Sequence, residues 1–261
     1  MEDAEVLLVE RDDDGVVVVT LNRPARRNAL GKALVARLRE TVAALGSDPS
    51  ARVIILAGAG DKAFCAGADL KERREMEPEE VTRFVGALRA MMDEVAALPQ
   101  PTIAAMDGAA LGGGAELALS CDLRVMGPAA TFGLPETHLG IIPGAGGTQR
   151  LPRLIGCARA KELIFTGRRV TAPEAVQLGL ANRAAAGDAV EAARQLAAPI
   201  LTAAPIALAQ AKRAVDEGIE LQIDAAMTVE KRCYDVTIPT EDRLEALAAF
   251  REKRPPVFKG R

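Results

Sequence analysis

Two glutamates and the glycine run near them are the residues of this chain best suited to chemistry. Gly112, Gly113 and Gly114 lead directly into an apolar segment with helical spacing. Such a segment exposes backbone N–H groups at a helix N-terminus, where negative charge is favoured. Glu116 and Glu136 stand among apolar and small residues, where a carboxylate is costly unless it is paired or used. Together these residues indicate acid/base chemistry on a substrate that develops oxyanion charge.

Each of these residues also has an ordinary structural interpretation. Glu116 alone is typical of a partnered acid within a helix, and Glu136 follows Pro135 as a helix-start residue would. Cys65 and the single histidine, His138, are far apart in the sequence and no orienting acid accompanies them, so a packed thiol is favoured over a nucleophile. His138 either lines a pocket or caps and packs. Chemistry is the better interpretation only because both glutamates flank one glycine loop.

The composition is that of an ordinary globular protein and argues against several classes. With 261 residues, one large domain or one domain with a small appendage is expected. A net charge of -3 argues against a dedicated polyanion-binding protein. The acidic residues 1–5 do not look like a signal peptide, and no apolar run approaches the ~20 residues of a spanning helix. The four cysteines have neither metal-site nor disulfide spacing, so we expect a reduced, cytoplasmic protein without a metal site.

The elements that must position these residues change in type along the chain. Up to residue 126, β-branched runs alternate with segments of helical spacing, which predicts an α/β fold with right-handed crossovers. From residue 146 onward strands are rare, and a change of element type is predicted near residue 200. Strands are predicted at 16–21, 53–56, 102–106 and 123–126, and helices at 32–45, 78–98, 159–165, 172–178, 188–201, 205–217, 219–234 and 241–253.

Motifs in a fixed order make the chain resemble the enoyl-CoA hydratase/isomerase (crotonase) superfamily over essentially its whole length. Within that superfamily it is most similar to methylglutaconyl-CoA hydratases, through residues 63–73, 150–165 and 237–256. The superfamily motifs are Leu-Asn-Arg-Pro at 21–24 with Asn-Ala-Leu at 28–30, Phe-Cys-Ala-Gly-Ala-Asp-Leu-Lys at 64–71, the segment 107–116, Pro-Glu at 135–136, and Ile-Pro-Gly-Ala-Gly-Gly-Thr-Gln-Arg-Leu at 142–151.

The resemblance implies an architecture. Residues 1–200 would form a crotonase-like spiral of ββα units that carries the active site. Residues 201–261 would form a helical region used in trimer formation and in completing the coenzyme A site, and trimers commonly pair into hexamers. The ligand would be an acyl-CoA thioester in an extended groove. Coenzyme A is then part of the substrate, and neither a further cofactor nor a metal is implied.

The resemblance also implies a mechanism. The thioester oxygen would lie between the backbone N–H groups of Ala68 and Gly113. Glu116 would deprotonate the water that attacks the third carbon of the substrate, and Glu136 would protonate the second carbon. Isomerases of the superfamily often keep only one of these acids, so both together favour hydration. The expected substrate pair is 3-methylglutaconyl-CoA and 3-hydroxy-3-methylglutaryl-CoA, of leucine and isovaleryl-CoA metabolism; a general short-chain enoyl-CoA hydratase is the alternative.

The resemblance also suggests which residues would bind the rest of the substrate. A carboxylate at the far end of the substrate would need a polar partner, for which His138, Arg73 and Arg74 are candidates.

The alternative function of a different class is RNA binding, which the methylglutaconyl-CoA hydratase family includes through a lysine-rich helix. The matching helix, 32–45, has no dense basic face, so we expect no specific nucleic-acid binding and no membrane binding. The coenzyme A candidates are Arg26, Arg27, Ala66, Asp69, Leu70, Lys71, Phe250 and Lys253, the last reaching a neighbouring subunit's site.

Overall fold

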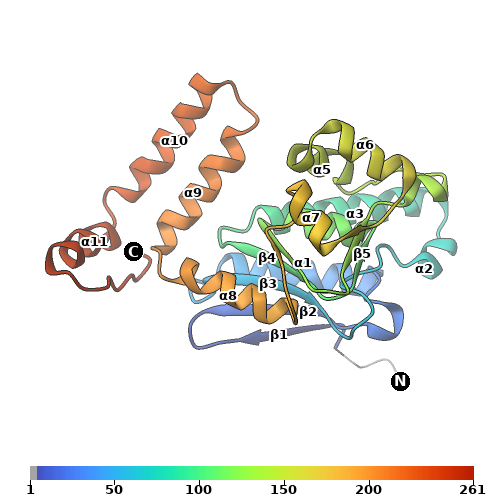
Figure 1. Cartoon of the computed structure of the whole chain (residues 1–261), viewed down its shortest axis with the longest axis horizontal. Helices are drawn as coiled ribbons and strands as arrows, with labels where there is room; N and C mark the ends of the chain where they lie inside the picture. The colour runs from blue at the N-terminus through green and yellow to red at the C-terminus, as the bar shows by residue number, and fades with distance from the viewer. Residues whose placement is uncertain (1–4) are drawn as a thin grey trace.

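A six-stranded sheet lies at the centre of the computed structural model, which describes residues 5–261 (Figure 1). Only the edge strand β1 runs antiparallel to its neighbour, and the other paired strands are parallel. The α/β class predicted from the sequence is confirmed. In spatial order the strands are β1 (Leu7–Arg11), β2 (Val16–Leu21), β3 (Val53–Gly58), β4 (Thr102–Met106), β6 (Leu123–Met126) and β9 (Arg183–Ala184).

Both faces of this sheet are covered by helices, which explains why its central strands are continuous apolar runs. Alternate residues of β2 and β3 point to opposite faces, so Val17 and Ile54 join one buried cluster while Val18 and Ile55 join the other. The first cluster includes α1 (Lys32–Gly46), α3 (Pro78–Ala96) and α4 (Gly113–Ser120), and the second is closed by α8 (Ala189–Leu201).

A second, three-stranded sheet carries the glycine loop and the second glutamate. It is ordered β5 (Ala109–Leu111), β7 (Thr131–Gly133) and β8 (Val170–Thr171). β5 leads into α4, and β7 leads into the short 3-10 helix η2 (Glu136–Leu139). Because β5 and β7 pair in parallel, the segments that follow them leave the sheet at the same edge. Glu116 and Glu136, which are distant in sequence, are therefore brought to one place.

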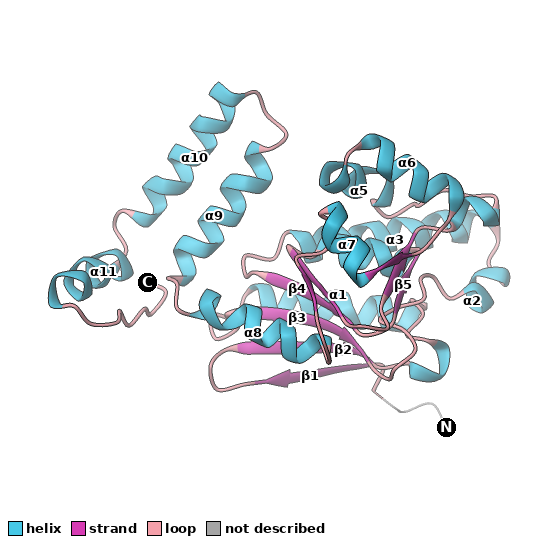
Figure 2. Cartoon of the chain, in the orientation of Figure 1, coloured by secondary structure: helices cyan, strands magenta, loops and turns pink. Residues whose placement is uncertain are grey.

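The remaining helices pack around this edge or project from the body. Figures 1 and 2 show α9 (Pro205–Gly218) and α10 (Ile223–Thr237) as a hairpin that extends away from the sheets, with α11 (Glu241–Glu252) beyond it. Large apolar side chains on this extension face solvent, including Ile219, Ile223 and Phe250. The division of the chain near residue 200 remains a prediction. The remaining helices are η1 (Pro24–Arg26), α2 (Leu70–Arg74), α5 (Gly147–Ile155), α6 (Cys157–Thr166) and α7 (Ala172–Leu178).

The sequence prediction differs from the structure in a few elements. The helix predicted at 219–234 begins only at Ile223, because Gly218 ends α9 and Gln222 is extended. Strand β1 was not predicted, since it is a short edge strand whose residues are mostly exposed. Helix α5 was not predicted either, because it begins with glycine and contains Pro152. Within residues 5–261 no single helix is long and apolar enough to cross a membrane; the bent pair α8 and α9 passes that test only jointly.

Candidate active site

A cavity of about 620 Å³ brings together both glutamates and the glycine loop. Most of its wall is apolar, and its ionisable side chains are Glu116, Glu136 and Arg73. It lies between α2, α3, the start of α4 and the segment from η2 to Ala145. The lining consists of Ala66, Gly67, Ala68, Leu70, Arg73, Val85, Leu88, Leu111, Gly112, Gly113, Glu116, Pro135, Glu136, Leu139, Ile141, Ile142, Gly144 and Ala145.

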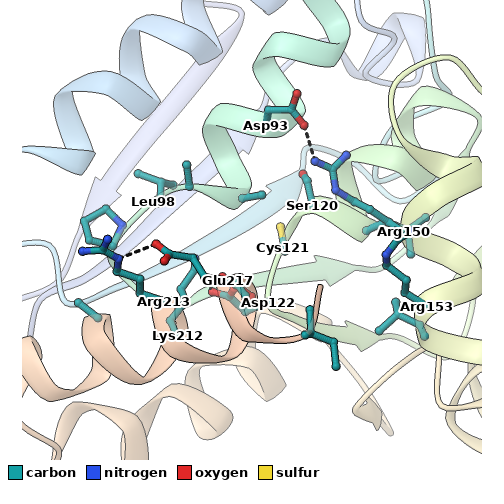
Figure 3. Close-up of a pocket in the computed structure, with 18 of the residues that line it drawn as sticks. Asp93, Leu98, Ser120, Cys121, Asp122, Arg150, Arg153, Lys212, Arg213 and Glu217 are labelled. Atoms are coloured by element: carbon teal, nitrogen blue, oxygen red, sulfur yellow. Dashed lines mark hydrogen bonds and ion pairs between the residues drawn. The ribbon is translucent and has the colours of Figure 1, made fainter. Parts of the chain in front are cut away.

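A larger cavity, of about 790 Å³, lies between α9 and the ends of α3 and α4 (Figure 3). It contains neither glutamate. Most of its cations are paired within the protein: Arg150 pairs with Asp93 at 2.7 Å and Arg213 with Glu217 at 2.6 Å. Lys212 likewise pairs with an aspartate, at 2.9 Å. The smaller cavity is therefore the candidate active site despite its size.

Glu116 is fixed in the cavity wall by backbone hydrogen bonds. Its side chain comes from α4 and the residue is 3% exposed. Its Oε1 accepts hydrogen bonds from the N–H groups of Ala145 at 2.7 Å and Gly147 at 2.9 Å. Burial raises the pKa of Glu116, while these two donors and the charge of Arg150 lower it. The carboxylate is thus held in one orientation by donors that favour its ionised form.

Glu136 lies in a different environment. It is the first residue of η2 and is 8% exposed. Its Oε2 is buried and has no hydrogen-bond partner among the described residues. Burial raises the pKa of Glu136 to about 7, and the nearby charge of Glu116 acts in the same direction. At neutral pH this carboxyl group therefore exchanges readily between its protonated and ionised forms.

Two unpaired backbone N–H groups lie beside the acids. A Cβ atom added at Gly113 would lie 3.5 Å from the nitrogen of Ala68, so the two segments are in contact there. Within residues 5–261 neither the Ala68 N–H nor the Gly113 N–H donates a hydrogen bond. Gly67 has a φ of +91°, which L-residues rarely adopt, and Leu30 donates a hydrogen bond to its carbonyl at 2.8 Å. Two neighbouring N–H groups are therefore available to a negatively charged oxygen.

The residues predicted to contact coenzyme A fall into three groups. Ala66 and Leu70 line the cavity, and Lys71 is exposed next to them. Asp69 is buried and caps α2, accepting from the Lys71 N–H at 3.1 Å and pairing with Arg23 at 3.1 Å. Arg23 was not predicted as a site residue, although it stands in the motif at 21–24. Of the rest, Arg26 and Arg27 are exposed beside η1, and Phe250 and Lys253 are exposed on and just after α11, at the far end of the molecule (Figure 1).

The three candidates for a substrate carboxylate also separate. Arg73 lines the cavity and makes no ion pair within residues 5–261. Arg74 is exposed and outside the lining. His138 is exposed too, and a Cβ atom at Gly167 would lie 3.1 Å from its ring, so it packs over that turn rather than into the cavity.

The apolar wall of the cavity was missed by the sequence analysis. Val85 and Leu88 come from α3, and Ile141 and Ile142 from the loop after η2. These residues follow ordinary helix or loop patterns, so the sequence does not indicate that they face the cavity. They give the acids an apolar surrounding, which strengthens electrostatic interactions there.

Comparisons with known proteins agree with the resemblance. The profile of the family "Enoyl-CoA hydratase/isomerase" matches residues 11–261. The chain is 55% identical over 254 residues, 95% of this chain and 87% of the relative, to the enoyl-CoA hydratase domain-containing protein 2, mitochondrial, of Homo sapiens. It is 48% identical over 264 residues, 99% of this chain and 78% of the relative, to the human methylglutaconyl-CoA hydratase, mitochondrial. Likeness in sequence therefore does not single out the methylglutaconyl-CoA hydratases.

The predicted cytoplasmic location is contradicted by these comparisons, because both human relatives are named as mitochondrial proteins. That prediction depended on the acidic residues 1–5, of which 1–4 lie outside the described residues, and on unpaired cysteines. The cysteines are free in the structure. Free thiols indicate a reducing environment, which several cellular compartments provide, so they do not identify the cytoplasm.

The fold agrees as well. A crystal structure of an enoyl-CoA hydratase from Bacillus anthracis superposes with a TM-score of 0.96 and 47% identity, covering 98% of this chain and 100% of that one. The predicted crotonase-like architecture is confirmed, and the cavity with its two acids lies within the matched region. This chain belongs to the enoyl-CoA hydratase/isomerase family of the crotonase superfamily.

Proposed function

We propose that this protein catalyses the reversible addition of water to the double bond of a 2-enoyl-CoA thioester. The observation that carries the proposal is the pair of buried glutamates, held in different environments on one cavity beside two unpaired N–H donors. Hydration needs a base for the water, an acid for the second carbon and stabilisation of an enolate oxygen. The two glutamates can serve as the base and the acid, and the two N–H donors can stabilise the enolate oxygen.

In the hydration direction Glu116 acts as the base. Its Oε1 is held by Ala145 and Gly147, which leaves Oε2 free to accept a proton from water. The water oxygen then bonds to the third carbon of the substrate, and the electron pair of the double bond moves to the thioester as an enolate. The enolate oxygen accepts hydrogen bonds from the N–H groups of Ala68 and Gly113.

Glu136 then acts as the acid. Because its pKa is raised to about 7, a large fraction carries a proton at neutral pH, and its unpartnered Oε2 provides a site for that proton. Transfer of this proton to the second carbon collapses the enolate and completes the hydroxyacyl product. Dehydration follows the same steps in reverse, with the roles of the two acids exchanged. The mechanism needs no cofactor beyond the coenzyme A of the substrate.

Coenzyme A is proposed to bind at the cavity mouth near α2 and η1. Arg26, Arg27 and Lys71 are exposed and make no ion pair within the described part of the chain. Unpaired cations are available to phosphate groups. Phe250 is 87% exposed and far from its own cavity, so we propose that it and Lys253 complete the site of a neighbouring subunit in a trimer or a hexamer.

For the acyl group we propose 3-methylglutaconyl-CoA, with 3-hydroxy-3-methylglutaryl-CoA as the hydration product. Arg73 supports this choice, since it is a cation without a partner in an otherwise apolar and acidic cavity. His138 and Arg74 lie outside that lining and are weaker candidates for the same role. The apolar surfaces of Val85 and Leu88 favour the alternative, a hydratase for short unbranched chains.

RNA binding through α1 is not supported by the charge pattern of that helix. Lys32 forms an ion pair with Glu80, and Arg39 with Glu94. Arg37 pairs at 3.4 Å with Glu40. The basic side chains of α1 are therefore neutralised locally, and we expect no specific RNA affinity. Filter binding at physiological salt tests this, and sub-micromolar affinity would contradict it.

The substrate is tested by comparing kcat/KM for 3-methylglutaconyl-CoA and crotonyl-CoA in the wild type, Arg73→Met and Arg74→Met. Removing a buried charge partner costs about 2–5 kcal/mol, so Arg73→Met should lower kcat/KM for the dicarboxylic substrate by roughly 30-fold or more. It should leave crotonyl-CoA turnover nearly unchanged, and Arg74→Met serves as the matched control. A tenfold preference of the wild type for crotonyl-CoA would favour the short-chain alternative. Loss of both activities to the same extent would remove Arg73 from substrate recognition.

A further inference from the structure

The turn that holds Glu116 is itself held by one arginine. Ala145 and Gly147, the two donors to Glu116 Oε1, lie on either side of Gly146 at the start of α5. Arg150, one helical turn later, extends back and donates from Nη1 to the carbonyl oxygen of Ala145 at 3.1 Å. Ala145 therefore donates its N–H to the Glu116 carboxylate and accepts a hydrogen bond from Arg150 at its carbonyl oxygen.

Arg150 is anchored on its other side to a different helix. Its Nη2 donates to Oδ1 of Asp93, on α3, at 2.7 Å (Figure 3). The Arg150 side chain is 21% exposed, less than most of the arginines in ion pairs. Gly146 has a φ of +113°, and a Cβ atom there would overlap Arg150 Nη1. The turn is therefore shaped around the guanidinium group, which connects α3 to the backbone that orients Glu116.

Few charged groups face Glu116. Glu136 comes from η2, Arg73 from α2 and Arg150 from α5. Arg150 is the one of these that contacts the turn holding the carboxylate, and its charge lowers the pKa of Glu116 against the effect of burial. Loss of Arg150 would act twice, by releasing the turn and by removing a positive charge.

We propose that Arg150 is a positioning residue for the hydration step: through the carbonyl of Ala145 it holds the turn that orients Glu116 toward the reacting water. Asp93 fixes the arginine in this role. The inference rests on the proposed function, since it assigns Arg150 a part in presenting the base. It touches neither the substrate nor the reacting atoms.

The test compares Arg150→Ala, Arg150→Lys and Asp93→Asn with Arg153→Ala, a control that removes an exposed ion pair from the same helix. Misplacement of a catalytic group by about 1 Å costs on the order of 100-fold, so Arg150→Ala should lower kcat about 10- to 100-fold. The KM should stay within about twofold, because binding contacts are untouched. Arg150→Lys should recover part of the loss, Asp93→Asn should show a smaller loss, and Arg153→Ala should behave as the wild type.

A second measurement needs no substrate. Carbon-13 NMR titration of the glutamate carboxyl groups, with Glu116→Gln to assign the signal, should show a higher Glu116 midpoint in Arg150→Ala than in the wild type. A folded Arg150→Ala with unchanged kcat and an unchanged midpoint would overturn the proposal. If that variant does not fold, wild-type behaviour of both Arg150→Lys and Asp93→Asn would overturn it. A wild type that hydrates no thioester would refute the proposed function instead, and the titration would still report whether Arg150 positions Glu116.

Discussion

Replacing Glu136 with Gln should remove activity and stabilise the protein at alkaline pH. Glu136 is 8% exposed, and burial raises its pKa from 4.5 to about 7. The folded state therefore keeps this proton to higher pH than the unfolded chain does. Ionisation of Glu136 then costs stability as the pH rises from about 4.5 to about 7, and the full cost is present above that range.

The size of this effect follows from the same values. Each pH unit between folded and unfolded pKa corresponds to about 1.4 kcal/mol, so the cost at pH 8 is at most about 3.5 kcal/mol. Water entering the open cavity reduces this cost. We therefore expect the advantage of Glu136→Gln over the wild type in free energy of unfolding to be about 1–2 kcal/mol larger at pH 8 than at pH 5. Glutamine has nearly the same shape, so packing is preserved.

The assay is urea unfolding of the wild type and Glu136→Gln at pH 5 and pH 8, at one protein concentration because self-association shifts apparent stability. Glu75→Gln, at an exposed position, is the matched control. The gain should be confined to Glu136→Gln and should be larger at pH 8. Equal free energies of unfolding for the two proteins at both pH values would refute the reasoning that burial makes this carboxylate costly.

Three further substitutions test the site. Glu116→Gln should lower the single-turnover hydration rate by roughly 10²–10⁴-fold with little change in thioester affinity, because it removes the base and keeps the shape; near-normal turnover would exclude Glu116 as the base. Gly113→Pro removes one of the two proposed oxyanion donors and should cost at least about 10²-fold in kcat in a folded protein; normal turnover would place the oxyanion hole elsewhere. Gly146→Ala should lower the free energy of unfolding by about 1–3 kcal/mol, since φ is +113° there. Gly86→Ala, in open space within α3, should instead raise it by about 0.5–1 kcal/mol, and equal effects of the two would refute the strain argument.

Much of the fold could be predicted because its helices and central strands have strong periodic signals. Val16–Leu21 is a continuous β-branched run, as expected of a strand buried on both faces. Helix α3 combines a proline near its start with an apolar stripe. The elements that were missed carry weak signals: β5 and β7 are three residues long, and their pairing depends on segments far apart in sequence. No local pattern specifies such a pairing.

The candidate site, like the fold, could be predicted only in part from the sequence. The glycine loop and the family resemblance predicted that Glu116 and Glu136 act at one site, and both line one cavity. The parallel pairing of β5 with β7, which brings them together, was not predicted. The hydrogen bonds to Glu116 from Ala145 and Gly147 could not be predicted, because they depend on the shape of the turn before α5, where Arg150 binds the Ala145 carbonyl. Side-chain direction was equally hidden, so Arg73 and His138 could not be distinguished until the cavity lining was known.

The central claim is tested most directly by the rate at which the purified protein hydrates crotonyl-CoA and 3-methylglutaconyl-CoA, followed by loss of the ultraviolet absorbance of the conjugated thioester. The wild type should hydrate at least one of them, and Glu116→Gln and Glu136→Gln should each be slower by roughly 10²–10⁴-fold while folding normally. Wild-type protein that leaves both thioesters unchanged, or either variant retaining near-normal turnover, would contradict hydration by this pair of acids.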